Sequence, residues 1–331
     1  VVVVFVLYAL LLSFILLYSF SQLSLLISFF KRDNSEVEFD ELSSFPKVTI
    51  QLPIYNEGLV VKRLIDSVCS IDYPRSELEI QVLDDSDESF LKVTETIIQK
   101  YRENGIDIVH ITRPSRVGYK AGALQYGLEI AKGDFVAIFD ADFLPPKDFL
   151  KKMLPAFQND KVGMVQSRWG HLNKDFSLLT KLQAFGLDAH FSVEQEGRMN
   201  SSCFINFNGT GGVWRKKCIV DSGSWQSDTL TEDLDLSYRA QLKGWQFRYI
   251  ESVESPAELP ISVYPLKKQQ FRWSKGAAEC WRKNLMKVLK SDFGLFTKIH
   301  AFFHLSNSFL FLAILLSGFL SLMLLYIKIY L

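Results

Sequence analysis

Two long runs of uncharged, mostly apolar residues constrain the fold of this chain more than any other feature. Val1 to Phe30 contains no Asp, Glu, Lys or Arg, and neither does a second run from Ala301 to Ile327. At about 1.5 Å of rise per residue, a helix of either length exceeds the ~30 Å hydrocarbon core of a bilayer. We therefore predict two transmembrane helices, at residues 1–30 and 299–328.

Basic residues beside the two runs predict the orientation. Lys31 and Arg32 follow the first run, and the second is preceded by Lys283, Lys287, Lys290 and Lys298. Because Lys and Arg near span ends favour the cytoplasmic side, the residues between the spans should face the cytosol. We expect an integral, multi-pass protein of a bacterial inner membrane or a eukaryotic endomembrane. The chain starts without Met inside an apolar run, so we also expect it to be part of a longer protein with further helices.

Composition excludes two classes of protein and indicates a compartment. The 37 Lys and Arg residues balance 37 Asp and Glu residues, whereas a nucleic-acid binder should be clearly basic. An aromatic content of 14% is too high for a disordered chain. The four cysteines include no Cys-x-x-Cys pair, which favours neither a zinc site nor a disulfide framework and fits a reducing, cytosolic environment.

The segment between the runs begins as an alternation of β-rich and helical stretches. We predict strands at 47–53, 78–83, 106–111 and 135–139, with helices at 60–70, 90–102 and 120–130 between them. This order indicates an α/β domain with parallel strands, in which ligands bind at the carboxyl ends of the strands. Neither a Gly-x-Gly-x-x-Gly nor a Gly-x-x-x-x-Gly-Lys-Ser/Thr motif is present, which argues against a dinucleotide-binding enzyme and a nucleoside triphosphatase.

A further helical segment precedes the second apolar run. Residues 274–298 place apolar side chains near helical spacing, with Lys and Arg on the other faces. This pattern predicts an amphipathic helix in the membrane interface, although an ordinary surface helix packed on the domain would show the same pattern.

Acidic residues follow two of the predicted strands. Asp140 and Asp142 come directly after a buried strand, and two such carboxylates repel each other unless a cation lies between them. They therefore form a candidate Mg²⁺ or Mn²⁺ site, with a solvated turn as the alternative. Asp84 and Asp85 could accept hydrogen bonds from a base or ribose, or could cap the next helix.

A third acidic cluster, Thr231-Glu-Asp-Leu-Asp235, opens a predicted helix. A helix N-terminus with acidic residues that complement its dipole would explain this composition. A catalytic interpretation depends on the other motifs of the chain.

Four motifs in this order resemble one known family. They are Asp84-Asp85, Asp140-Ala-Asp142, Thr231-Glu232-Asp233 and Gln269-Gln-Phe-Arg272-Trp273. The chain resembles membrane-integrated family 2 glycosyltransferases of the cellulose synthase type over nearly its whole length. Segments such as Gln51-Leu-Pro-Ile-Tyr-Asn-Glu57 and Gly118-Tyr-Lys-Ala-Gly-Ala-Leu124 resemble the plant cellulose-synthase-like mannan and glucan synthases in particular.

The resemblance implies a fold and an activity. The fold would be GT-A-like, with a mixed, mostly parallel sheet and helices on both faces over residues 31–273, flanked by transmembrane helices and the interface helix. The activity would be inverting transfer of a hexose from a UDP-glucose-type or GDP-mannose-type donor to the end of a β-linked polysaccharide, in a processive manner. The alternatives are a non-processive enzyme that makes a glycolipid and a non-catalytic nucleotide-sugar-binding partner of a synthase.

The resemblance also implies partners, a cofactor and residue roles. The partners would be the lipid bilayer and either a second copy of the chain or a secretion partner, and nucleic acid would not be a partner. The cofactor would be Mg²⁺ or Mn²⁺. Asp233 would be the general base, with Asp235 as its rival, and Asp140 and Asp142 would hold the metal. The other residues with implied roles would bind the nucleotide sugar (Tyr55, Glu57, Asp84, Asp85, Lys120, Asp140, Gln269 and Arg272) or the acceptor (Trp273, Phe207, Asn208 and Gly209).

Overall fold

The computed structural model describes residues 2–32, 42–58 and 60–330. Within these residues one seven-stranded sheet has the order β3-β2-β1-β4-β6-β5-β7. Strand β6 is antiparallel to both of its neighbours, whereas the other pairs are parallel, which confirms the mixed, mostly parallel sheet. The strands are β1 (Val48–Ile54), β2 (Leu78–Asp84), β3 (Ile108–Ile111), β4 (Phe135–Ile138), β5 (Val162–His171), β6 (Gly212–Arg215) and β7 (Gln246–Ala257).

The first four strands match the predicted ones to within a few residues. Every residue of β2 is buried, and all of β1 except Pro53, as expected for parallel strands covered on both faces. Ile54 pairs with Asp84, so β1 and β2 end together. The chain therefore reaches Tyr55 and Asp85 at the same edge of the sheet.

Helices cover both faces of the sheet and enclose two separate hydrophobic clusters. On one face, α2, α3 and α5 pack on Ile50 and Leu52 of β1. On the other face, α4, α8 and α9 pack on Val136 and Ile138 of β4. These helices are α2 (Val61–Cys69), α3 (Glu88–Glu103), α4 (Tyr119–Ile130), α5 (Phe149–Met153), α8 (Lys216–Asp221) and α9 (Glu232–Leu242). Short 3-10 turns are η1 (Arg75–Glu77), η2 (Leu154–Gln158) and η3 (Lys174–Phe176).

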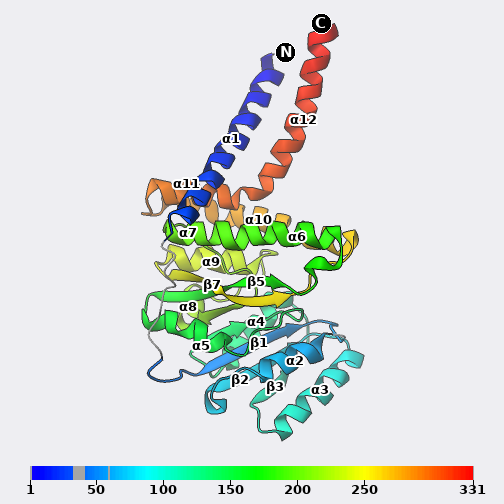
Figure 1. Cartoon of the computed structure of the whole chain (residues 1–331), viewed down its shortest axis with the longest axis vertical. Helices are drawn as coiled ribbons and strands as arrows, with labels where there is room; N and C mark the ends of the chain where they lie inside the picture. The colour runs from blue at the N-terminus through cyan, green and yellow to red at the C-terminus, as the bar shows by residue number, and fades with distance from the viewer. Residues whose placement is uncertain (1, 33–41, 59, 331) are drawn as a thin grey trace.

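A layer of helices separates the sheet from the two apolar helices. It consists of α6 (Leu178–Asp188), the π-helical turn Ala189–Gln195, α7 (Glu196–Asn200), α10 (Val263–Lys290) and α11 (Leu295–Leu305). Beyond it, α1 (Val2–Phe30) and α12 (Asn307–Tyr330) run side by side away from the sheet, and the two termini lie at the same end of the molecule (Figure 1). Both helices are long and apolar enough to cross a membrane, and both are exposed rather than buried in a core.

The predicted second span is divided in the structure. A break at Ser306 separates α11 from α12, so the residues from 299 to 305 belong to a helix that packs on the domain. The reason is polar anchoring, because His300 lies 3.2 Å from Ser21 Oγ and 3.0 Å from Ser24 Oγ of α1. His304 Nδ1 lies 2.8 Å from Tyr238 Oη of α9. The helix that could cross a membrane therefore starts at Asn307.

The predicted interface helix at 274–298 also has other bounds in the structure than the sequence predicts. Helix α10 begins at Val263, before the Gln-x-x-Arg-Trp motif, and ends at Lys290. Its second half is partly buried, with Cys280, Leu285 and Val288 in a cluster shared with α9 and α11. The amphipathic pattern thus reflects packing on the domain in this half of the helix, and membrane contact of the segment stays a prediction.

Candidate active site

Lys120 joins three elements at the carboxyl edge of the sheet. It lies in the first turn of α4, and its Nζ is 2.5 Å from Asp140 Oδ1, directly after β4. The same Nζ donates to the carbonyl oxygen of Gly209 over 3.0 Å. Asp140 is held in turn by its backbone N–H, which donates to Thr210 Oγ1 over 2.9 Å. Residues from positions 120, 140 and 209 thus meet at one point.

Two further carboxylates surround this point. Burial and the negative charge of Asp140 raise the pKa of Asp142 to about 7. The same two causes raise the pKa of Glu57, which follows β1. Burial alone would lower the pKa of Lys120, but the carboxylates of Asp140 and Glu232 more than offset this and raise it. The site therefore carries an excess of closely spaced negative charge.

The donor set fits a divalent cation that a substrate helps to bind. In the described part of the chain, no group of three or more His, Cys, Asp or Glu side chains forms a closed metal site. A pair of carboxylates, completed by substrate phosphates and water, is the usual arrangement for Mg²⁺. Asp140 and Asp142 provide such a pair, and their mutual repulsion is what a bound cation would relieve.

Asp233 lies on the other side of Gly209. A Cβ atom added to Gly209 would be 3.0 Å from Asp233 Oδ2 and 3.4 Å from Lys120 Nζ, so the glycine separates the two side chains. Burial and the neighbouring Glu232 carboxylate raise the pKa of Asp233 to about 7, and the backbone N–H of Leu234 donates to its Oδ1. A carboxylate with this pKa is suited to accept a proton at neutral pH.

The loop at 207–211 forms the floor between these groups. Gly209 and Gly211 both have positive φ, which lets the chain turn sharply beside Asp233. The Phe207 ring is fully buried against Trp214, so contacts of this loop with a ligand would come from Asn208 and Gly209. Asn208 donates through its backbone N–H to Gln166 Oε1 over 3.1 Å.

The π-helical turn contributes a contact to the same loop. His190 Nε2 lies 3.4 Å from Asn208 Oδ1, and its Nδ1 lies 3.1 Å from Glu194 Oε2. A π-helical turn inside a helix often marks a functional position. His190 and Glu194 thus connect the layer next to α1 with the candidate site.

The helix α10 brings only part of its motif to this point. The ring centroids of Trp273 and Trp169 are 6.5 Å apart, and Trp169 Nε1 donates to the carbonyl oxygen of Thr210 over 3.4 Å. Arg272 is exposed and lines a cavity of about 370 Å³ with Tyr264 and Phe271. Among the described residues, neither Arg272 nor Gln269 contacts the Lys120–Asp140 pair.

The nucleotide end of the predicted site contains an arginine loop that sequence reasoning left without a role. Arg113 Nε donates to Asp85 Oδ1 over 2.9 Å, and its Nη2 contacts Oδ2. The Arg116 guanidinium lies 3.2 Å above the ring of Tyr55. Both arginines belong to the Arg-Pro-Ser-Arg segment before α4, and two arginines close to a β3–α4 turn could have indicated the pairing.

Asp84 is less available than Asp85. It is buried, accepts from the backbone N–H of Ser86 and lies 3.1 Å from His110 Nε2. Burial alone would raise the pKa of Asp84, but the hydrogen bonds from His110 and Ser86 more than offset this and lower it. Of the two carboxylates, Asp85 is therefore the better candidate for contact with a ligand.

The family described as "Glycosyltransferase like family 2" matches residues 46–276. The chain is a family 2 glycosyltransferase. The matched residues run from just before β1 into α10, so the transferase domain contains every candidate residue named above.

Plant relatives are similar over most of the transferase. The "Probable glucomannan 4-beta-mannosyltransferase 4" of Oryza sativa subsp. japonica is 42% identical over 266 residues, covering 78% of this chain and 48% of the relative. The "Glucomannan 4-beta-mannosyltransferase 2" of Arabidopsis thaliana is 39% identical over 292 residues, covering 83% of this chain and 55% of the relative. The chain thus spans about half the length of these relatives.

Solved structures confirm the GT-A-like fold of the transferase. The mannosyltransferase PcManGT from Pyrobaculum calidifontis, in complex with GDP-Man and Mn²⁺, has a TM-score of 0.71 at 19% identity and covers 95% of this chain and 85% of its own. Residues 1–349 of S. aureus TarS with UDP-GlcNAc have a TM-score of 0.57 at 18% identity, covering 80% of this chain and 73% of their own.

Proposed function

We propose that this transferase moves a hexose from a nucleoside diphosphate sugar to the end of a β-linked polysaccharide, with inversion at the anomeric carbon. The observation that carries the proposal is the position of Asp233, which faces Lys120 and Asp140 across Gly209. An acceptor hydroxyl oxygen attacks the anomeric carbon, the bond to the diphosphate oxygen breaks, and the hydroxyl proton passes to Asp233. One such displacement converts an α-linked donor into a β-linked product.

Lys120 and Asp140 form the donor end of the proposed reaction. Lys120 would bind the diphosphate, on which negative charge develops as the glycosidic bond breaks. Asp140 and Asp142 would hold Mg²⁺ or Mn²⁺, which when bound stabilises the same developing charge. Tyr55 and Asp85 lie at the same edge of the sheet, where the base and ribose of the donor would bind.

A GDP-mannose-type donor is the one that the comparisons support. The plant relatives carry the name glucomannan 4-beta-mannosyltransferase, and the solved mannosyltransferase is a complex with GDP-Man and Mn²⁺. We therefore propose GDP-mannose rather than UDP-glucose as the donor, and either Mn²⁺ or Mg²⁺ as the cofactor.

The aromatic side chains beside the base form the proposed acceptor end. The neighbouring rings of Trp273 and Trp169 offer flat apolar faces, suited to the C–H surface of a pyranose. An extended acceptor could use both rings, which favours a polysaccharide over a lipid with one sugar. A processive mode and a homo-oligomeric or secretion partner belong to the same proposal.

The proposed membrane arrangement follows from the exposed apolar side chains. Helices α1 and α12 cross the bilayer, and the transferase domain lies on its cytosolic side. Leu178, Leu182 and Phe185 of α6 are exposed at helical spacing, as are Leu295 and Phe296 of α11. We therefore assign contact with the membrane interface to α6 and α11 as well as to the first turns of α10.

Transfer from defined donors tests the proposal. Purified protein in detergent is incubated with labelled GDP-mannose or UDP-glucose and with Mg²⁺ or Mn²⁺, and the product is digested with β-mannanase or β-glucanase. We expect a β-mannanase-sensitive polymer from GDP-mannose, and loss of transfer after removal of the metal with EDTA. A lipid-soluble product with a single sugar would support the glycolipid alternative, and binding of the donor without any transfer would support the non-catalytic one.

The base is tested by Asp233→Asn. This variant should bind GDP-mannose as the wild type does, measured by isothermal titration, and should show no transfer. Asp160→Asn is the matched control, because the Asp160 side chain is fully exposed. Retained turnover in Asp233→Asn, or loss of donor affinity as its main effect, would contradict the assignment of Asp233 as the base.

A further inference from the structure

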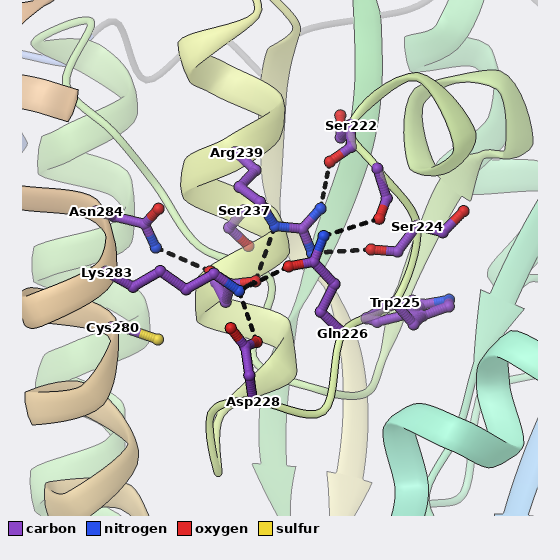
Figure 2. Close-up of polar contacts among 12 residues, drawn as sticks. Ser222, Ser224, Trp225, Gln226, Asp228, Ser237, Arg239, Cys280, Lys283 and Asn284 are labelled. Atoms are coloured by element: carbon purple, nitrogen blue, oxygen red, sulfur yellow. Dashed lines mark hydrogen bonds and ion pairs between the residues drawn. The ribbon is translucent and has the colours of Figure 1, made fainter. Parts of the chain in front are cut away.

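Asp235, two residues after the proposed base, is the most completely bonded carboxylate of α9. It is fully buried. It accepts three hydrogen bonds: from Arg239 Nε over 2.8 Å, from Lys283 Nζ over 2.9 Å and from Asn284 Nδ2 over 2.9 Å. Figure 2 shows Lys283 and Asn284 reaching from α10 toward Arg239 of α9. Because the side chain is fully buried and all three partners are donors from α9 and α10, the carboxylate is not open to an incoming substrate hydroxyl.

The two acidic residues lie on different sides of the first turn of α9. At about 100° per residue, positions 233 and 235 are about 200° apart around the helix axis. Asp233 faces Gly209, whereas Asp235 faces α10. Burial alone would raise the pKa of Asp235, but Arg239, Asn284 and Lys283 more than offset this and lower it. The contacts with α10 therefore favour the charged form of Asp235, and because it faces away from Gly209 it is a poorer candidate for the base than Asp233.

The two cations extend the contact to the segment before the acidic motif. Arg239 donates to the carbonyl oxygens of Ser222 and Ser224, the latter over 2.8 Å. Lys283 Nζ contacts Gln226 Oε1 over 2.7 Å and Asp228 over 2.6 Å (Figure 2). The segment 222–228 leads directly to Thr231 and Asp233, so these contacts also hold the chain just before α9.

A second contact joins α9 and α10 near the Gln-x-x-Arg-Trp motif. A Cβ atom added to Gly276 would lie 2.5 Å from Thr231 Cγ2, so the Thr231 side chain packs closely against the backbone of α10 there. The backbone N–H of Leu230 also donates to Glu279 Oε2 over 2.8 Å. Helix α10 is continuous from Val263 to Lys290, and Trp273 therefore moves as one body with the turn that binds Asp235.

The opposite side of α9 is tied to the floor of the site. Ser237 Oγ accepts from the backbone N–H of Phe207 over 2.9 Å and donates to the carbonyl oxygen of Asp233 over 2.6 Å. The first turn of α9 is thus held between the 207–211 loop on one side and α10 on the other.

We propose that Asp235 is a positioning residue that ties the base helix α9 to α10 and so sets the distance between Asp233 and Trp273. The proposal rests on the proposed function, in which Asp233 is the base and Trp273 binds the acceptor. Asp235 touches neither substrate, and it acts only through the two helices that it connects.

Asp235→Asn tests the proposal, because it removes the charge and replaces one acceptor oxygen by a donor beside Arg239 and Lys283, which can only donate. A misplacement of about 1 Å at a reacting group costs roughly 100-fold in rate. We expect kcat to fall at least about tenfold, while the KM for GDP-mannose stays within about twofold because the donor end of the site is not attached to α10.

An exchanged pair provides the rescue. Asn284 Oδ1 is buried and has no hydrogen-bond partner in the described part of the chain, so an Asp at 284 can accept from an Asn at 235. Asp235→Asn combined with Asn284→Asp restores an amide–carboxylate bond between the helices and keeps a carboxylate beside Lys283. We expect this double variant to recover kcat at least about fivefold over Asp235→Asn, a gain that general loss of stability would not produce.

Glu79→Gln is the matched control. Glu79 is also a buried carboxylate, bonded to Thr49 Oγ1 over 2.7 Å, but it lies at the end of β2 opposite to Asp84. Its loss should lower the melting temperature without changing kcat. If Asp235→Asn does not fold, Lys283→Gln is measured instead, and the same fall in kcat with unchanged KM is expected.

Hydrogen exchange separates failure of this proposal from failure of the proposed function. Amides of residues 228–236 and 266–276 should exchange faster together in Asp235→Asn, return toward the wild type in the double variant and stay unchanged in Glu79→Gln. Wild-type kcat in Asp235→Asn, or equal falls in kcat in it and in Glu79→Gln, overturns the proposal. A wild-type protein without any transfer activity overturns the proposed function, and exchange then still decides whether Asp235 couples the two helices.

Discussion

A single methyl group at Gly209 should separate the cost of backbone strain from the cost of displacing Asp233, the proposed base. Gly209 has a φ of +83°, and a Cβ atom there would lie 3.0 Å from Asp233 Oδ2 and 3.4 Å from Lys120 Nζ. Gly209→Ala therefore strains the backbone and presses against the proposed base Asp233, whereas its contact with Lys120 is an ordinary van der Waals one.

The structure predicts the size of both effects. A non-glycine residue in the left-handed region costs about 1–2 kcal/mol of stability. A contact of 3.0 Å forces the Asp233 carboxylate to move by a few tenths of an ångström. Because a shift of about 1 Å costs roughly 100-fold in rate, we expect kcat to fall about tenfold.

Gly105→Ala is the control for the strain alone. Gly105 has a φ of +75°, and a Cβ atom there would meet nothing within 4 Å. Thermal unfolding should show similar losses of melting temperature in the two variants, whereas radiometric transfer assays should show a fall in kcat for Gly209→Ala only. Equal kcat values in the two variants would contradict the prediction that Gly209 keeps the proposed base Asp233 in place.

Three further outcomes follow from the structure. Asp233 must be unprotonated to accept a proton, and its pKa is raised to about 7, so kcat/KM should rise with pH through about 7 and then level off. A flat pH profile of kcat/KM from about pH 6 to 8 would contradict its role as the base. Arg116 lies over the ring of Tyr55, so Arg116→Ala should remove a competitor for base stacking and lower the donor KM about two- to fivefold in initial-rate measurements, as expected for a cation–π contact of about 0.5–1 kcal/mol. A Cβ atom at Gly197 of α7 would lie 2.5 Å from a carbonyl oxygen of α1, so Gly197→Ala should destabilise the detergent-solubilised protein by about 1–3 kcal/mol. Gly186→Ala is the control, because a Cβ atom there meets open space, and equal melting temperatures of the two variants would contradict this packing.

The first half of the domain was predictable because its signals are local. The strands at 47–139 are mostly buried, β-rich runs, and a helical stretch with apolar residues at helical spacing follows each of the first three. The sequence analysis predicts none of the later strands, because they do not continue the regular alternation of strand and helix. Several helices lie between β5, β6 and β7, and β6 is antiparallel to both of its neighbours. Their place in the sheet depends on pairing with distant strands.

In the apolar runs too, the sequence could not predict features that depend on contacts between distant residues. Hydropathy predicted both helices that could cross a membrane, but not the break at Ser306. The residues before the break are apolar like those after it, and what separates them is the contact of His300 and His304 with α1 and α9. Such contacts join residues that are far apart in the sequence.

The sequence by itself determined which residues are acidic, aromatic or glycine in the motifs, and therefore the family and the chemistry that Asp140, Asp142 and Asp233 can support. Only the tertiary structure decided what each side chain faces, such as Lys120 beside Asp140 and Asp235 turned toward α10. The physical reason is that a carboxylate two positions along a helix points to the other side of it, and its surroundings there come from elements distant in the sequence. Burial and neighbouring charges then raise the pKa of Asp233 and lower that of Asp235, although both belong to one turn of one helix.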